Sequence, residues 1–107
     1  MYLIERTKIY HKWASELKDI KAKSLINERV YRVGDGLFGD IAPVGDGVSE
    51  LRIHYGPGYR VYFSKKADKI ILLLCGGSKS SQDRDITVAK KLLKQWENNN
   101  GIKNLSL

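Results

Sequence analysis

The stretch that decides the fold runs from Glu50 to Ile86 and reads ELRIHYGPGYRVYFSKKADKIILLLCGGSKSSQDRDI. It predicts two alternating strands at about Ser49–Tyr55 and Tyr59–Ser64, joined by a Gly-Pro-Gly turn. An almost wholly apolar strand at about Lys69–Gly76 follows, and a polar cluster then opens a helix. Because successive side chains of a strand point to opposite faces, the alternation sorts the first two strands into one apolar face and one cationic face.

The length of the turn sets the register of this hairpin. A three-residue loop at Gly56–Gly58 would place apolar residues opposite apolar residues throughout. The pairs would be Tyr55 with Tyr59, Ile53 with Val61, Leu51 with Phe63, His54 with Arg60, and Arg52 with Tyr62. The cationic face then carries two arginines, a histidine and a tyrosine side by side, which suits a phosphate-bearing ligand.

Caps, glycines and apolar periodicity predict the other elements. These are a strand at Tyr2–Glu5, helices at about Thr7–Asp19 and Ile20–Val33, and a glycine-rich loop over Gly34–Gly47 with a short extended piece around Phe38–Ile41. A last helix is expected to begin at Ser80 or Ser81, to carry Asp83 and Asp85 in its first turn, and to end at Asn98–Gly101. The order β-α-α-β-β-β-α predicts an α+β fold, with a small, mainly antiparallel four-stranded sheet and helices packed on one face. We expect one domain over residues 1–107, with 97–107 as a flexible tail.

The amino-acid composition limits the classes of function that the protein can have. No stretch approaches the roughly 18 apolar residues of a membrane span, and the N-terminus lacks a signal-peptide pattern. A single cysteine, Cys75, excludes an internal disulfide framework and is expected to be a buried, inert thiol. We therefore expect a cytoplasmic protein without membrane contact. The net charge of +7 is concentrated on residues 51–79, which carry six basic and one acidic side chain, and this favours a polyanionic partner over a merely solubilising surface.

Four phrases of the chain form a specific combination. They are GVSELRI at Gly47–Ile53, GPGYRVYF at Gly56–Phe63, LLCGGSK at Leu73–Lys79, and QDRDI at Gln82–Ile86 followed by Ala89. With the leading helix around Trp13 and the glycine-rich loop, they resemble the RelE/ParE superfamily of toxin–antitoxin toxins, in particular the HigB-like "addiction module killer protein" branch. The resemblance covers nearly the whole chain up to about Trp96.

The resemblance implies a bacterial toxin encoded beside a small antitoxin. Many such toxins are metal-independent, ribosome-dependent endoribonucleases (mRNA interferases) that cut mRNA in the decoding site and inhibit translation, whereas the ParE relatives poison gyrase. The antitoxin in this branch is usually a helix-turn-helix protein, and promoter DNA is contacted only through the toxin–antitoxin complex. A ParE-like gyrase poison and a noncatalytic nucleic-acid-binding module remain the alternatives to the nuclease.

RNA cleavage needs a base, an acid and stabilisation of the phosphate charge. Arg52 and Arg60 are the candidates for phosphate stabilisation, unless they are surface arginines without a task. His54 is the acid–base candidate, and its arginine neighbours should disfavour the protonated form and favour service as a base. Lys79 follows Gly76-Gly77, where a bend could turn it over the cationic face to contact phosphate or act as general acid.

The remaining candidates have positioning or RNA-binding roles. Asp85 is expected to hold His54 or an arginine, if it is not simply a helix-capping residue. Tyr62 could stack a base, and Gln82 and Arg84 are assigned to RNA binding. The other histidine, His11, is expected to be solvated. Two separated histidines and one buried cysteine do not make a zinc site, and no cofactor is implied.

Overall fold

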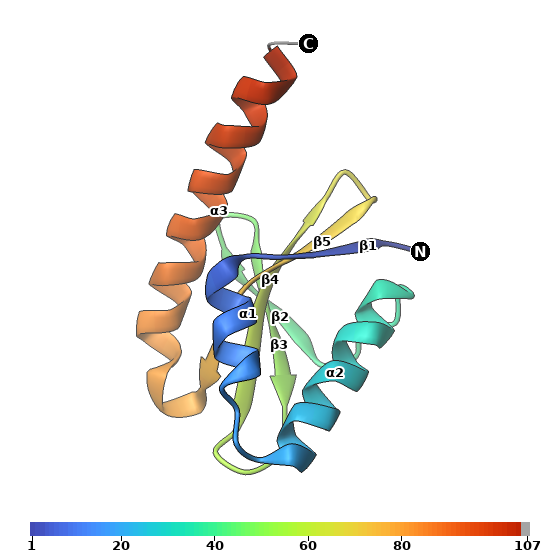
Figure 1. Ribbon diagram of the computed structural model, residues 1–107, viewed down its shortest axis with the longest axis vertical. Coiled ribbons are helices and arrows are strands. Elements are labelled where there is room, and N and C mark those ends of the chain that lie inside the picture. Colours follow the sequence, from blue (N-terminus) through green and yellow to red (C-terminus); the bar gives the residue numbers. More distant parts are fainter. Residues whose placement is uncertain (106–107) are drawn as a thin grey trace.

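The computed structural model describes the backbone of residues 1–105 and the side chains of residues 1–99 (Figure 1). Its elements, in chain order, are β1 (Leu3–Arg6), α1 (Lys8–Ser15), α2 (Ile20–Gly34), β2 (Ile41–Gly45), β3 (Val48–Ile53), β4 (Tyr59–Lys66), β5 (Ile70–Ser78), the short 3₁₀ helix η1 (Lys79–Ser81) and α3 (Gln82–Leu105). None of the helices within this described part is long and apolar enough to cross a membrane.

The strands form one mixed sheet in the order β1-β5-β4-β3-β2. β1 is parallel to β5, and the other neighbours are antiparallel. The α+β class is confirmed, but the prediction of four strands is wrong. The additional strand is β2, which lies in the segment expected to be a loop. It folds back on β3 because Gly45, Asp46 and Gly47 all have positive φ and close a tight turn.

Helices cover both faces of the sheet, so the prediction of helices on one face only is wrong. α1 and α2 pack on the first face, where Tyr10, Ile26 and Val33 meet Val61 and Leu73. α3 packs on the second face, where the core residues include Val48, Tyr62, Leu74, Ala89 and Leu93. The strand β5 is buried from Ile71 to Cys75, which confirms the expectation of an interior strand that is covered on both sides.

The β3–β4 hairpin is offset from the expected register by two residues. Arg52 lies opposite Arg60, and Ile53 lies opposite Tyr59. The reason is a longer turn, in which the Gly58 N–H donates to the Tyr55 carbonyl at 3.1 Å. Because a shift of two residues preserves side-chain alternation, each residue stays on its expected face.

The capping residues predict where the helices begin better than where they end. Thr7 caps α1 as expected, because its Oγ1 accepts from the Tyr10 N–H at 3.0 Å. α3 was expected to end at Asn98–Gly101, but it extends to Leu105, and its last turns project beyond the sheet (Figure 1). Asn and Gly lower helix propensity without removing a backbone donor, so they need not end a helix. Residues 106–107 of the expected tail lie outside the described part.

Candidate functional site

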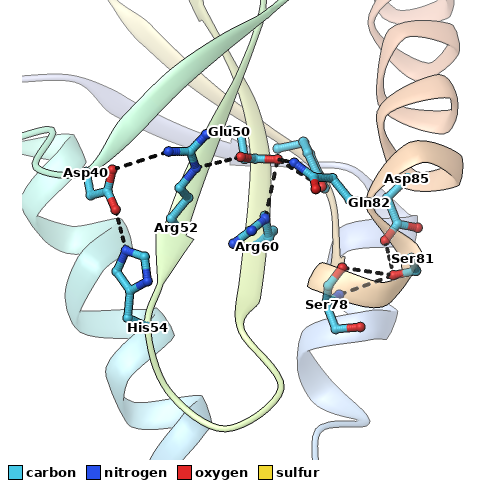
Figure 2. A network of polar contacts seen from close by, with 10 residues as sticks. Asp40, Glu50, Arg52, His54, Arg60, Ser78, Ser81, Gln82 and Asp85 are labelled. Carbon is cyan, nitrogen blue, oxygen red and sulfur yellow. Dashed lines mark hydrogen bonds and ion pairs between the residues drawn. The ribbon is translucent and has the colours of Figure 1, made fainter.

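A buried carboxylate is the centre of a polar cluster on the α3 side of the sheet (Figure 2). Glu50 of β3 is 0% exposed. Its Oε1 accepts from Arg52 Nε at 2.8 Å, and its Oε2 accepts from Gln82 Nε2 at 2.7 Å. The Tyr62 hydroxyl donates to the same Oε2 at 3.3 Å, and Arg60 Nε lies 3.5 Å from it. Glu50 therefore ties β3, β4 and the start of α3 together through charge-assisted contacts.

A second carboxylate orients the histidine at the end of β3. His54 Nε2 donates to Asp40 Oδ2, and Asp40 Oδ1 lies 3.9 Å from Arg52 Nη1. The hydrogen bond from His54 holds the pKa of Asp40 below its ordinary value. The His54 side chain is 72% exposed. Because Asp40 engages Nε2, the Nδ1 atom is the ring nitrogen left for a substrate.

An arginine of α2 fixes the backbone that carries this pair. Arg29 Nη1 donates to the Arg52 carbonyl at 2.7 Å, and Nη2 donates to the Phe38 carbonyl at 3.4 Å. The Arg52 N–H donates to the Asp40 carbonyl at 3.0 Å. Gly39 permits this approach, because a Cβ there would lie 2.9 Å from Arg29 Nη2. The sequence analysis gave Arg29 no functional role.

A separate polar group lies where β5 passes into α3 (Figure 2). The Ser81 hydroxyl donates to Asp85 Oδ2, and Arg84 Nε lies 3.8 Å from Asp85 Oδ1. Asp85 is 8% exposed, and it contacts the backbone so closely that a Cβ on Gly77 would lie 1.8 Å from its Oδ2. Asp85 therefore organises the start of α3. The arginine that its carboxylate contacts is the neighbouring Arg84, and its hydrogen-bond partner is Ser81 rather than His54.

The chain was compared with known proteins. No family model matches it. An uncharacterized protein of Haemophilus influenzae is 48% identical over 92 residues, which span 86% of this chain and 93% of the relative. The chain belongs to the family of this Haemophilus protein. Because the Haemophilus relative carries no assigned activity, the function of this family is inferred below from the chemistry of the site.

The structure brings five of the predicted site residues together. Arg52, Arg60, Tyr62 and Gln82 meet at Glu50, and His54 joins them through Asp40 and Arg52. The Arg52 side chain remains 37% exposed, whereas the Arg60 side chain is only 10% exposed. Arg52 can therefore contact a ligand directly, and Arg60 is better placed to position other groups.

Three further predictions concern side chains near the cluster. Tyr62 is 0% exposed under α3, so it cannot stack a base from an open face, and that prediction is wrong. Burial, with the charge of Glu50, raises the pKa of Tyr62 above its ordinary value. Lys79 is exposed and lies beside the β3–β4 turn, where a Cβ on Gly58 would meet its Cβ at 3.4 Å. The Arg84 side chain is 78% exposed.

The two carboxylates of the cluster, Asp40 and Glu50, are not among the site residues predicted from the sequence. Alternation places Glu50 on the same face as Arg52, so its position was readable from the sequence. Asp40 had no such signal, because it precedes β2 in the glycine-rich segment. The two carboxylates offset part of the positive charge of Arg52 and Arg60.

The arrangement can orient an imidazole and bind an anion beside it. Within the described residues, no three His, Cys, Asp or Glu side chains group closely enough to hold a metal ion. Cys75 is 4% exposed, and burial raises its pKa to about 12, so the expectation of a buried thiol is confirmed. Within this cluster, the basic side chains that are most exposed to solvent are the imidazole of His54 and the guanidinium-bearing side chain of Arg52.

Proposed function

We propose that the chain is a RelE/ParE-type toxin that cleaves mRNA on the ribosome as a metal-independent endoribonuclease and so inhibits translation. The observation that carries the proposal is the exposed imidazole of His54, held by Asp40 beside the partly exposed guanidinium of Arg52. The phrase resemblance described above points the same way. A helix-turn-helix antitoxin would be its partner, and promoter DNA would be reached only through that complex.

The proposed reaction is an attack of the ribose 2′-oxygen on the adjacent phosphorus. His54 Nδ1 takes the proton of the 2′-hydroxyl, and Arg52 stabilises the charge on the non-bridging oxygens. The bond from phosphorus to the 5′-oxygen breaks, the product carries a 2′,3′-cyclic phosphate, and the leaving 5′-oxygen takes a proton. Lys79, an exposed cation beside the β3–β4 turn, could supply it. Glu50 is a positioning residue because it is buried and holds Arg52, and Arg60 acts on Arg52 only through Glu50.

A ParE-like gyrase poison is the second candidate, and one observation favours it. Asp40 and Glu50 together neutralise much of the charge of Arg52 and Arg60, which weakens this face as a phosphate site. An inhibitor that acts without catalysis has no need of a strong phosphate site. The two candidates differ in their products in the cell: the nuclease leaves cleaved mRNA, and the gyrase poison leaves trapped gyrase–DNA complexes.

The test uses the two histidines of the chain as a matched pair. Wild type, His54→Ala and His11→Ala are induced in bacterial cells, and mRNA 5′ ends are mapped. Wild type and His11→Ala should produce codon-phased cleavage, and His54→Ala should reduce it by about 100-fold or more, as expected for loss of a general base. His54 and His11 are both exposed, so neither change should unfold the protein, and thermal unfolding of the purified variants checks this.

Two results would overturn the nuclease, and a third would remove its proposed base. Intact transcripts together with trapped gyrase–DNA complexes would identify the ParE-like poison. Intact transcripts and active gyrase, with RNA retained on the purified protein, would identify a noncatalytic binding module. Equal cleavage by His54→Ala and His11→Ala would remove His54 from the reaction.

A further inference from the structure

A small cavity of about 240 Å³ lies at the edge of β5, between α1 and the start of α3. Its walls include Trp13, Tyr59, Arg84 and Asp85, and its floor is formed by Gly76 and Gly77. The proposed reaction uses none of the aromatic residues of this cavity. Its volume is below the roughly 300 Å³ of the smallest pockets that enclose a drug-sized ligand, so it suits a single planar ring system.

The floor of the cavity is an open strand edge. The ladder between β1 and β5 ends at the pair Arg6 and Leu73, and Thr7 Oγ1 then donates to the Leu74 carbonyl at 2.6 Å. Beyond that point β5 pairs only with β4 among the described strands. The edge at Gly76-Gly77 therefore offers backbone donors and acceptors to a ligand in the cavity.

The walls approach this edge because both floor residues lack a side chain. A Cβ on Gly76 would lie 2.3 Å from the Trp13 ring. Trp13 also meets Tyr59 edge-to-face, with 6.5 Å between ring centroids, so α1 and β4 together supply an aromatic wall. On the opposite wall, Asp85 Oδ1 lies 3.8 Å from Arg84 Nε and keeps the exposed guanidinium beside the cavity.

We propose that this cavity binds one unstacked base of a single-stranded RNA, an inference that rests on the proposed function for the RNA itself. Unstacked bases are held in proteins by aromatic rings, by arginine planes and by hydrogen bonds to the base edge, and the cavity offers all three. The ligand of the cavity is therefore a nucleobase of the RNA substrate. Trp13 and Tyr59 bind this base and take no part in the cleavage reaction.

The place of the cavity fits a nucleotide close to the cleaved bond. Gly77 lies opposite Arg60, and Arg60 lies opposite Arg52. Two strand spacings separate the cavity floor from Arg52, which is about 10 Å. A base in the cavity would therefore belong to a nucleotide near the phosphate that Arg52 contacts, and it would splay the RNA across the sheet.

Tryptophan fluorescence tests the inference without requiring cleavage. The chain has two tryptophans, so a full-length Trp96→Phe variant leaves Trp13 as the reporter. It is titrated with a 2′-O-methyl hexaribonucleotide, which cannot be cleaved, and separately with adenosine monophosphate and ribose 5-phosphate. We expect saturable quenching by the hexanucleotide, weaker binding of the mononucleotide, and no quenching by ribose 5-phosphate.

Matched arginine variants locate the ligand. Arg84→Ala should weaken binding of the hexanucleotide on the order of tenfold, the size expected for loss of one stacking plane. Arg32→Ala, an equally charged change on the exposed surface of α2, should leave binding unchanged. Tyr59→Leu should weaken binding similarly, with Tyr31→Leu on α2 as its control and thermal unfolding as the check on folding.

The other outcomes overturn either the base site or the nuclease. Equal quenching by ribose 5-phosphate would show that no base is bound, and mononucleotide binding as tight as that of the hexanucleotide would identify a free nucleotide as the ligand. Equal affinities of Arg84→Ala and Arg32→Ala would place the RNA elsewhere. Codon-phased cleavage without Trp13 quenching would refute the base site alone, whereas quenching without cleavage would refute the nuclease and keep the base site.

Discussion

At the scale of single residues, Glu50 is the group on which the cluster depends. It is 0% exposed, and its two oxygens contact Arg52, Arg60, Tyr62 and Gln82. A buried charge is tolerated only where partners replace its hydration, and removing one member of such a group leaves the others uncompensated. Glu50 is therefore expected to hold both the fold and the direction of Arg52.

The first prediction concerns the charge of this residue. Glu50→Gln keeps the shape of the side chain but leaves the buried Arg60 without a counter-charge, and should lower the free energy of unfolding by about 3 kcal/mol. Urea unfolding of the purified protein measures it. Glu28→Gln breaks a surface pair with Arg32 and should cost less than about 0.5 kcal/mol. Equal costs for the two variants would contradict a central role for Glu50.

Residues of the site were predictable where strand alternation governs them. Arg52, His54 and Arg60 lie on the face that their positions in the sequence indicate, and Glu50 follows the same rule. Asp40 was not predictable in this way, because its place depends on β2 folding back through three positive φ values and on Arg29 holding the preceding backbone. Such contacts join segments far apart in the chain, and local patterns do not encode them.

At the scale of secondary-structure elements, the start of α1 joins the helix to the sheet. Thr7 Oγ1 accepts from the Tyr10 N–H at 3.0 Å and donates to the Leu74 carbonyl at 2.6 Å. The second contact places α1 against β5, so that Trp13 meets Gly76. One hydroxyl thus both caps a helix and closes the strand edge next to the proposed base site.

The second prediction follows from this double role. Thr7→Ala should lower the free energy of unfolding by about 1 to 2 kcal/mol, because an N-cap and a buried acceptor both lose their partner. Thr87→Ala is the matched control, since Thr87 is exposed within α3 and donates only to the Asp83 carbonyl. Alanine favours a helix interior, so that change should be neutral or slightly stabilising. A chemical denaturation series that ranks the two variants in the opposite order would contradict the argument.

Strand alternation does not predict how much of the cationic sheet face α3 covers. Tyr62, Leu72 and Leu74 share the face with the arginines, and α3 buries that part of it. Arg52 and His54 lie toward the other end of the same face, where side chains remain partly open to solvent. Alternation assigns a residue to a face but does not show how far along the face a helix reaches, so Tyr62 was expected to be open.

At the scale of the whole molecule, the net charge of +7 is spread over a surface with local carboxylates. Asp40 and Glu50 neutralise part of the charge at the site, and the exposed cations Arg52 and Lys79 remain to contact a nucleic acid backbone. Affinity for single-stranded RNA then depends on how many phosphates these cations neutralise, because each contact releases condensed counterions.

The third prediction is the salt dependence of RNA binding. With two phosphate contacts, the logarithm of the affinity for the 2′-O-methyl hexanucleotide should fall with the logarithm of salt concentration with a slope of about −1.4. Lys79→Ala should reduce the steepness by about 0.7, the share of one phosphate on a single strand. Titrations at four or five salt concentrations, followed by fluorescence, measure both slopes.

Lys69→Ala separates a contact from the general charge of the protein. Lys69 follows β4 at the end of the sheet away from the β3–β4 turn, about 24 Å along the strand from Tyr59. That distance exceeds the Debye length of about 8 to 10 Å, so a lysine there acts weakly on RNA bound near Lys79. The two variants lose the same charge, and only the loss of a phosphate contact changes the slope. Equal slopes would mean that RNA is held by the overall charge, and would contradict its placement at the His54 end of the sheet.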